Sequence, residues 1–246
     1  MTTVIVLGMH RSGTSCLAGS LQASNLELGE VHTANPHNKK GNRENQAVMD
    51  LHESLLARVD ASWDAPAVVE WDEEHRKIRD AIIESFRETP RWGFKDPRTC
   101  FTLDGWLEVL PQTKLVGTFR NPKSVAQSLV TRNRGLGDLA DWYKVWEAYN
   151  ERVLHYHREF GFPIVDFDSP DAAYLKSLRV VYRHLGLRES AWERLKAFDL
   201  KGFFANLGSP EVFFDPSLRS NVTTDVEGLP ESTVQTYREL QQAAIH

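Results

Sequence analysis

The chain has 246 residues, of which 41% are hydrophobic and 10% aromatic, and it carries a formal net charge of -5. This length and apolar content suit one α/β domain with a sizeable core, so we treat residues 1–246 as a single domain. The negative balance excludes a general attraction to nucleic acid or to anionic membranes. Any anion site must therefore be a local cluster of Lys, Arg and backbone amides.

Cysteine content and the N-terminal sequence indicate where the chain works. The two cysteines, Cys16 and Cys100, are too few for a disulfide framework and are expected to be thiols in a reducing compartment. The N-terminus has neither the basic nor the apolar region of a signal peptide, and no run approaches the roughly 18 apolar residues of a membrane span. We expect a cytoplasmic protein without membrane or nucleic-acid partners. The oligomeric state is not indicated.

Apolar periodicity and turn residues predict alternating strands and helices. Cap and breaker residues help to place the ends: Asn42 is expected to cap a helix, Pro97 disfavours helix before it, Pro122 begins a helix and Gly186 ends one. In chain order we expect a strand at 2–7, a helix at 14–23, a loop at 29–42, helices at 43–59 and 72–88, a strand running into a loop over 91–99, a helix at 103–110, a strand at 113–119, helices at 122–132 and 138–160, a strand at 163–167, and helices at 171–185 and from Pro230 onward. This alternation predicts an α/β fold, with a central parallel sheet covered by helices on both faces.

The first strand leads into the loop GMHRSGTS, which has the Gly8 to Gly13 spacing of a phosphate-binding loop. Nucleotide triphosphatases continue with Gly-Lys-Ser/Thr, whereas here Thr14 follows the second glycine and the basic residue lies inside the loop. Backbone amides of residues 10–15 can surround an oxyanion at the positive end of the next helix. Further donors come from the side chains of Arg11, Ser12, Thr14 and Ser15. The alternative is a glycine turn that merely joins strand to helix.

A second basic turn, FRNPKSVAQSL at 119–129, repeats the order of strand, turn and helix. Arg120 follows the strand at its carboxyl end, where open α/β sheets bind ligands. Ser128 lies eight residues further on, about two helical turns away. Taken alone, the turn could equally be an ordinary helix entry with a solvated arginine.

Together, HRSGTS and RNPKSVAQS resemble the sulfotransferases that use 3′-phosphoadenosine 5′-phosphosulfate (PAPS). In that family the first loop cradles the 5′-phosphosulfate, and the second motif holds the 3′-phosphate through its Arg and Ser. The resemblance covers roughly residues 2–187 and implies a three-layer fold of that family. It assigns the 5′ end to Arg11, Ser12, Gly13, Thr14 and Ser15, and the 3′-phosphate to Arg120 and Ser128.

Two further features bear on the branch of the family. FDPSLRS at 214–220 is similar to a segment of bacterial and glycan-type members that returns to the nucleotide, which implies a nucleotide contact for Arg219. The Arg-Lys-Gly-x-x-Gly segment of the cytosolic small-molecule branch is absent. The resemblance therefore favours the bacterial or glycan-type branch, with a carbohydrate or secondary-metabolite hydroxyl as acceptor.

Sulfuryl transfer is an in-line displacement that needs a base for the acceptor hydroxyl and cations at the leaving oxygen. The resemblance implies Glu44 as the base, with Lys95 and Arg11 as the cations. A sulfuryl group carries less negative charge than a phosphoryl group, so no metal is expected.

Alternatives stay open for each of these assignments. Glu44 could instead stabilise a helix N-terminus, and Asp96 and Arg98 could pair locally and only shape the loop after Lys95. A histidine is the base in the small-molecule branch; the candidates are His10, His32, His37 and His52. Lys39 and Lys40 could line the acceptor entrance or be solvated. The aromatic stripe within 138–160 could stack an acceptor or belong to the core; it consists of Trp142, Tyr143, Trp146, Tyr149, His155 and Tyr156.

Two other functions compete with sulfuryl transfer. A kinase that uses ATP would need a magnesium ligand at a strand end, for which Asp166 and Asp168 are candidates. A non-catalytic protein of the same fold would bind the nucleotide without transferring a group.

Overall fold

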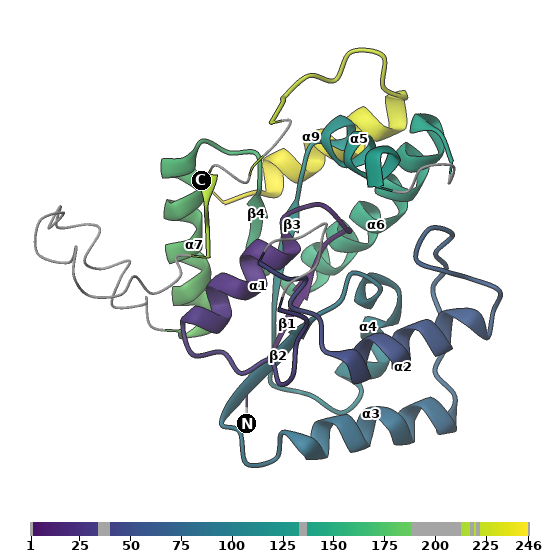
Figure 1. The fold of residues 1–246 in the computed structure, drawn as a ribbon, viewed down its shortest axis with the longest axis vertical. Helices are drawn as coiled ribbons and strands as arrows, with labels where there is room; N and C mark the ends of the chain where they lie inside the picture. Colours follow the sequence, from purple (N-terminus) through teal and green to yellow (C-terminus); the bar gives the residue numbers. More distant parts are fainter. Residues whose placement is uncertain are drawn as a thin grey trace, which may run out of the picture.

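The computed structural model describes residues 2–33, 40–132, 137–187, 213–216, 219 and 222–245. Within these residues, strands and helices alternate largely as the sequence predicts (Figure 1). The strands are β1 (Thr2–Leu7), β2 (Arg91–Lys95), β3 (Thr113–Phe119) and β4 (Ile164–Asp166). The helices are α1 (Thr14–Ala23), α2 (Gln46–Ala57), α3 (Glu73–Ser85), α4 (Thr99–Leu107), α5 (Pro122–Arg132), α6 (Leu139–Phe160), α7 (Asp171–Leu185) and α9 (Glu231–Ala243).

The strands form one parallel sheet in the order β2-β1-β3-β4. β1 lies between β2 and β3, with Val6 opposite Lys95 on one side and Leu7 opposite Gly117 on the other. From β1 the chain continues to β2 on one side of β1, and from β2 it crosses to β3 on the other side of β1. β1 and β3 therefore flank a topological switch point. Sheets of this order bind ligands beyond the carboxyl ends of those two strands.

Helices cover both faces of the sheet, which confirms the predicted three-layer architecture. Because successive strand residues point to opposite faces, Val4 and Val6 pack with α1 and α7, whereas Ile5 and Leu7 face the larger core. That larger core is built with α2, α3, α4, α5, α6 and α9. Figure 1 shows α1 and α7 on one side of the strands and α2, α3, α4 and α6 on the other.

Two helix boundaries differ from the expectation. Helix α2 begins at Gln46 rather than at 43, because Asn45, not Asn42, is its N-cap and accepts a hydrogen bond from the Val48 amide at 3.3 Å. The bridge between Val31 and Asn45 holds the preceding residues outside the helix. Helix α4 covers Thr99–Leu107 rather than 103–110. The Pro97 carbonyl accepts from the Cys100 amide at 3.1 Å, so the proline stands at the start of a helix, where its missing N–H costs nothing.

Two glycines in the strands differ in how closely their surroundings approach the position of an added Cβ. A Cβ at Gly93 in β2 would come within 2.2 Å of the Val4 carbonyl oxygen, which is backbone of the central strand. A Cβ at Gly117 in β3 would come no closer than 3.1 Å to a side chain, the Phe162 ring. We expect Gly93→Ala to lower the free energy of unfolding by about 1–3 kcal/mol, and Gly117→Ala by clearly less. Urea denaturation followed by circular dichroism measures both. Equal midpoints for the two variants would contradict this packing.

Candidate active site

The loop after β1 is curled tightly at the carboxyl edge of the sheet. Gly8, Arg11 and Gly13 have positive φ values of 146°, 66° and 85°. Gly13 is the N-cap of α1 and has no side chain that could occupy the amides of the first turn. A Cβ on Gly13 would lie 2.3 Å from the Phe167 ring, so the position requires glycine. The loop therefore leads into a helix N-terminus that no side chain caps, which suits an anion.

The two basic turns meet in space. Nε of Arg11 donates to Oγ of Ser128 at 2.8 Å, although the residues are 117 positions apart. The Thr118 hydroxyl, at the end of β3, donates to the Ser12 carbonyl at 3.1 Å. Burial and the neighbouring charges of Arg132 and Arg120 lower the pKa of Arg11. Positive charge is thus concentrated between β1 and β3, at the switch point.

Arg120 is held in place by the loop after β4. Its Nε donates to Oδ1 of Asp168 at 3.0 Å, and Oδ2 of the same carboxylate accepts from the Asn121 amide at 3.0 Å. The Arg120 carbonyl accepts from Nε1 of Trp146 in α6 at 3.0 Å. Both members of the ion pair are buried. Asp168, considered above as a magnesium ligand, instead serves as the carboxylate that orients Arg120.

Glu44 and Lys95 contact each other directly. Nζ of Lys95, the last residue of β2, lies 2.5 Å from Oε1 of Glu44, and the two side chains are only 1% and 7% exposed. Glu44 precedes the N-cap Asn45 and is not in the first turn of a helix, contrary to the expectation. Its carbonyl accepts from the His32 amide, and that pairing keeps the segment extended beside residue 32. The contact that Glu44 makes is therefore the one with Lys95, and the residue does not stabilise the dipole of α2 from within its first turn.

A second buried network lies directly behind this pair. Asp96 accepts from the backbone N and from Nη1 of Arg98 at 2.9 and 3.1 Å, and it lies 3.5 Å from Nδ1 of His52. Burial would raise the pKa of Asp96, but the nearby Nδ1 of His52, the charge of Arg98 and the hydrogen bond from the Arg98 backbone amide hold it well below its ordinary value. The local Asp96–Arg98 pair that the sequence left open is present. It shapes the turn that follows Lys95.

Comparisons with known proteins bear on this constellation. A family model described as the sulfotransferase family matches residues 3–193. The chain belongs to the sulfotransferase family. No curated protein sequence matches it closely enough to count as a relative.

Solved sulfotransferase structures share the fold. Sulfotransferase STF1 from Mycobacterium tuberculosis is 18% identical with a TM-score of 0.56, and the match covers 80% of this chain and 71% of that one. A sulfotransferase domain from the curacin biosynthetic pathway is 15% identical with a TM-score of 0.56, with coverage of 97% and 96%. Sulfotransferase STF9 from Mycobacterium avium is 14% identical with a TM-score of 0.51, with coverage of 85% and 69%. At such identities the likeness supports the three-layer fold alone.

The histidines of this sulfotransferase occupy different environments. The His10 ring lies against Trp63 and Tyr149, and its buried Nε2 has no partner among the described residues. Burial and the charge of Arg98 lower the pKa of His10 to about 3, so its imidazole is neutral at pH 7. His52 is fully buried and accepts from Nε1 of Trp106 at 2.9 Å. His32 pairs with Gln46 at the surface. The fourth candidate base, residue 37, lies outside the described residues.

Arg219 lies at the loop after β4, beside the start of α7. Its Nη1 donates to Asp171 at 2.7 Å, and its Nη2 donates to the carbonyls of Ser169 and Phe167. Its guanidinium also lies over the Phe167, Tyr174 and Phe214 rings. The residue therefore reaches the same edge of the sheet as Arg120.

The remaining sequence candidates divide between core and surface. Nζ of Lys40 donates to the Phe213 carbonyl at 3.0 Å, whereas residue 39 is outside the described part. The aromatic stripe of α6 is mostly core: Trp142, Trp146, Tyr149 and Tyr156 are buried, Tyr143 is partly buried and His155 is exposed. Sequence reasoning missed Trp63 altogether, because it stands in an irregular segment without periodicity.

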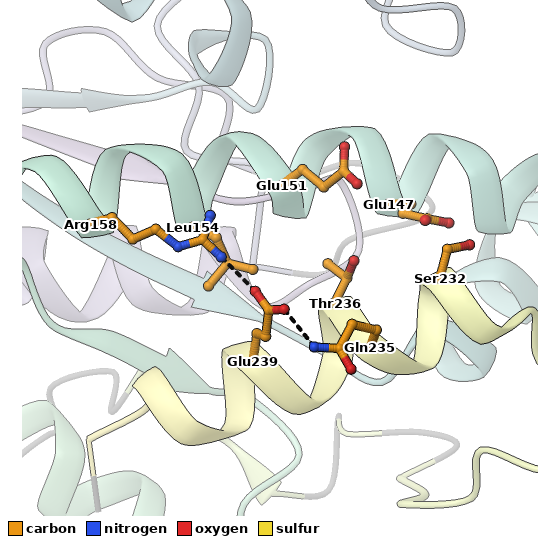
Figure 2. A pocket seen from close by; sticks show the side chains of 8 residues that line it. All are labelled: Glu147, Glu151, Leu154, Arg158, Ser232, Gln235, Thr236 and Glu239. Carbon is orange, nitrogen blue, oxygen red and sulfur yellow. Dashed lines mark hydrogen bonds and ion pairs between the residues drawn. The ribbon is translucent and has the colours of Figure 1, made fainter.

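A groove of about 320 Å³ lies between α6 and α9, away from these loops (Figure 2). Glu147, Glu151 and Glu239 line it, and Arg158, paired with Glu239 at 2.5 Å, is the cation among its lining residues. This acidic lining does not suit an anionic nucleotide.

Within the part of the chain that the structure describes, no three His, Cys, Asp or Glu residues come together as a group that could hold a metal ion. None of the helices described above combines the length and the apolar character that crossing a bilayer requires.

Replacing Asp96 tests the buried network. Asp96→Asn removes the charge that balances Arg98, and breaking a buried pair in this way costs about 3–5 kcal/mol of stability. Because the pKa of Asp96 is lower in the folded than in the unfolded chain, its stabilising effect is present above about pH 4 and is lost at lower pH. We expect the gap in unfolding free energy between wild type and variant to be largest at pH 7 and to narrow below about pH 4. Urea titrations at several pH values measure it.

A surface pair provides the control for that experiment. Glu73→Gln removes an exposed i,i+4 partner of Lys77 and should change stability by less than about 0.5 kcal/mol. A gap for Asp96→Asn that stays constant from pH 7 to pH 3 would contradict the assigned role of this carboxylate.

Proposed function

We propose that the protein is a PAPS-dependent sulfotransferase that acts on an acceptor hydroxyl, with a carbohydrate or a secondary metabolite as the favoured acceptor. The observation that carries this proposal is the 2.8 Å contact between Arg11 and Ser128. It joins two basic strand-to-helix turns into one site, and a nucleotide with phosphates at both 3′ and 5′ positions needs two such turns.

The donor-binding residues fit this nucleotide. On the proposal, residues Arg11 to Ser15 hold the 5′-phosphosulfate, and Arg120 and Ser128 hold the 3′-phosphate. The buried Ser12 hydroxyl has no hydrogen-bond partner among the described residues, which is the expected state of a group kept for a ligand. Gly13 is the N-cap of α1 and brings no side chain to the amides of its first turn, which leaves them available to an oxyanion. Arg219, on the neighbouring loop, adds a contact to the nucleotide.

Glu44 and Lys95 supply the groups that the transfer needs. PAPS, when bound, supplies the sulfuryl group, whose bond to the 5′-phosphate oxygen breaks as the acceptor oxygen bonds to sulfur. Glu44 accepts the proton of the acceptor hydroxyl at its carboxylate. The Lys95 ammonium, 2.5 Å from that carboxylate, places positive charge beside the reacting oxygens, and Arg11 does so from the loop after β1. The burial of the pair excludes water and strengthens both effects.

One structural neighbour is a sulfotransferase domain from the curacin biosynthetic pathway, and the match covers 97% of this chain. At 15% identity this likeness carries the fold only, so the preference for a carbohydrate or secondary-metabolite acceptor rests on the sequence motifs described above.

Donor selectivity tests the assignment of the second turn. We expect adenosine 3′,5′-diphosphate to bind wild type, and Ser128→Ala and Arg120→Ala to weaken it by about 10-fold or more, as loss of a charge-assisted hydrogen bond predicts. Adenosine 5′-monophosphate, which lacks the 3′-phosphate, should bind all three proteins similarly. Isothermal titration calorimetry measures the affinities. Lys123→Ala is the control, because Lys123 lies on the same turn but pairs with Asp225 at the surface. Failure of wild type to bind the diphosphate would contradict the proposal.

Substitution of Glu44 tests the base. Glu44→Gln keeps the size and a hydrogen-bond acceptor for Lys95 but removes the proton-accepting carboxylate, so kcat should fall by about 10²–10⁴-fold with donor affinity retained. Glu53→Gln, which alters an exposed carboxylate paired with Arg98, should leave kcat within about twofold. Mass-resolved sulfate transfer to a panel of hydroxyl acceptors gives the rates.

The same assay separates the competing functions. Transfer from PAPS should continue in the presence of a metal chelator, whereas an ATP-dependent kinase would lose its activity. Phosphoryl transfer from ATP would contradict the proposal. So would tight diphosphate binding without transfer to any acceptor of the panel, which is the behaviour of a non-catalytic protein.

A further inference from the structure

An aromatic residue outside the helices adjoins the loop that follows β1. Trp63 lies in the segment between α2 and α3, where its ring stacks on Trp142 at 5.6 Å between centroids with an interplanar angle of 19°. Its edge meets the His10 ring, with centroids 5.1 Å apart. His10 immediately precedes Arg11. A continuous row of rings therefore runs from the start of α6 to the anion-binding loop.

The inner end of this row lies at the loop that carries Arg11. The Tyr149 ring touches both His10 and Phe101 in α4, which begins three residues after Asp96. His10 therefore stands between Trp63 and the rest of the loop after β1. Its buried Nε2 has no hydrogen-bond partner among the described residues, which suits a ligand placed beside the two rings.

Trp63 differs from the structural tryptophans of the core. Trp92, Trp106 and Trp146 are fully buried, whereas Trp63 is only partly buried. Apolar side chains are exposed nearby in the chain: Val59 is 45% and Val68 54% exposed in the same segment, and Leu139 is 41% exposed one turn before Trp142. A partly open indole in a segment that also exposes apolar side chains suits a binding surface.

The segment that carries Trp63 is held in a defined shape. The Tyr149 hydroxyl donates to the Trp63 carbonyl at 2.8 Å, and the Ser62 hydroxyl donates to Asp64 at 2.6 Å. Arg58 pairs with Asp72 at the other end of the segment. These contacts fix the indole before any ligand binds, which lowers the entropic cost of binding.

We propose that Trp63, with His10, forms a wall of the acceptor site, and that the acceptor carries its hydroxyl on a flat apolar skeleton such as an aromatic ring. This inference rests on the proposed sulfotransferase function and selects among its acceptors. A flat ring gains offset or edge-to-face contact with the indole together with burial of its own apolar surface. A free sugar would need several hydrogen-bond partners, which an indole face does not provide.

Acceptor kinetics test the inference. The panel pairs 2-naphthol, a planar aryl hydroxyl, with methyl glucoside, a hydroxyl-rich ring without an aryl group. We expect wild type to have a kcat/KM at least 10-fold higher for 2-naphthol. Trp63→Ala should raise KM for 2-naphthol about 10-fold with a smaller change in kcat, and Trp63→Phe should retain KM within about threefold. Calorimetry should show the same affinity for adenosine 3′,5′-diphosphate in all three proteins.

Phe160→Ala supplies the matched control, since Phe160 is an exposed aromatic residue at the far end of α6. It should leave both KM and kcat unchanged. An unchanged KM for Trp63→Ala, or a wild-type preference for the glucoside, would overturn the inference while sulfate transfer itself stands. A parallel loss of donor affinity and of activity toward both acceptors would show a merely structural role and would also overturn it. Absence of diphosphate binding in wild type would instead contradict the proposed function.

Discussion

The candidate site depends on one constraint, the parallel pairing of β1 with β2 on one side and with β3 on the other. In a parallel sheet the carboxyl ends of neighbouring strands lie at the same edge. The register sets Val6 opposite Lys95 and Leu7 opposite Gly117. The loop after β1, the end of β2 and the turn after β3 therefore lie beside one another at the carboxyl edge of the sheet. The 2.8 Å contact between Arg11 and Ser128 follows from that arrangement. A slip of one residue would turn Lys95 to the opposite face and break its contact with Glu44.

Two buried ion pairs also lie at this edge of the sheet, and a gain in folding stability does not explain their presence. Removing an ion from water costs several kcal/mol, and apolar residues of similar volume often stabilise a core as well as a buried pair does. This edge nevertheless buries the Lys95–Glu44 and Arg120–Asp168 pairs. On the proposed function, the site holds a polyanionic donor and moves a proton, and both tasks need fixed charges in a water-poor place. The proposed function would therefore account for an arrangement that packing alone disfavours.

Most of the fold could be predicted from the sequence, and the two basic turns that the sequence singled out lie together in the structure, because each is a local strand-turn-helix unit. The first strand is a short, mainly apolar run, and each basic turn directly follows a strand, as GMHRSGTS follows Thr2–Leu7. Prediction failed where a distant contact decides the backbone. Glu44 was expected in a helical turn, but the bridge between Val31 and Asn45 keeps it outside. The partner of Arg120, Asp168, was also hidden, since β4 contributes its loop from 48 positions away.

The proposed donor and acceptor sites also differ in this way, because local sequence encodes the first and distant contacts assemble the second. A phosphate is recognised by backbone amides at a helix N-terminus and by a few cations, and a strand-turn-helix unit encodes these in about ten consecutive residues. An acceptor surface is assembled from side chains of unrelated segments. Trp63 belongs to an irregular stretch, and its neighbours His10 and Trp142 come from the loop after β1 and from α6. No sequence periodicity links such residues. The expectation of a PAPS donor could therefore be formed from sequence motifs, whereas the proposed nature of the acceptor could be argued only after the fold had placed these rings side by side.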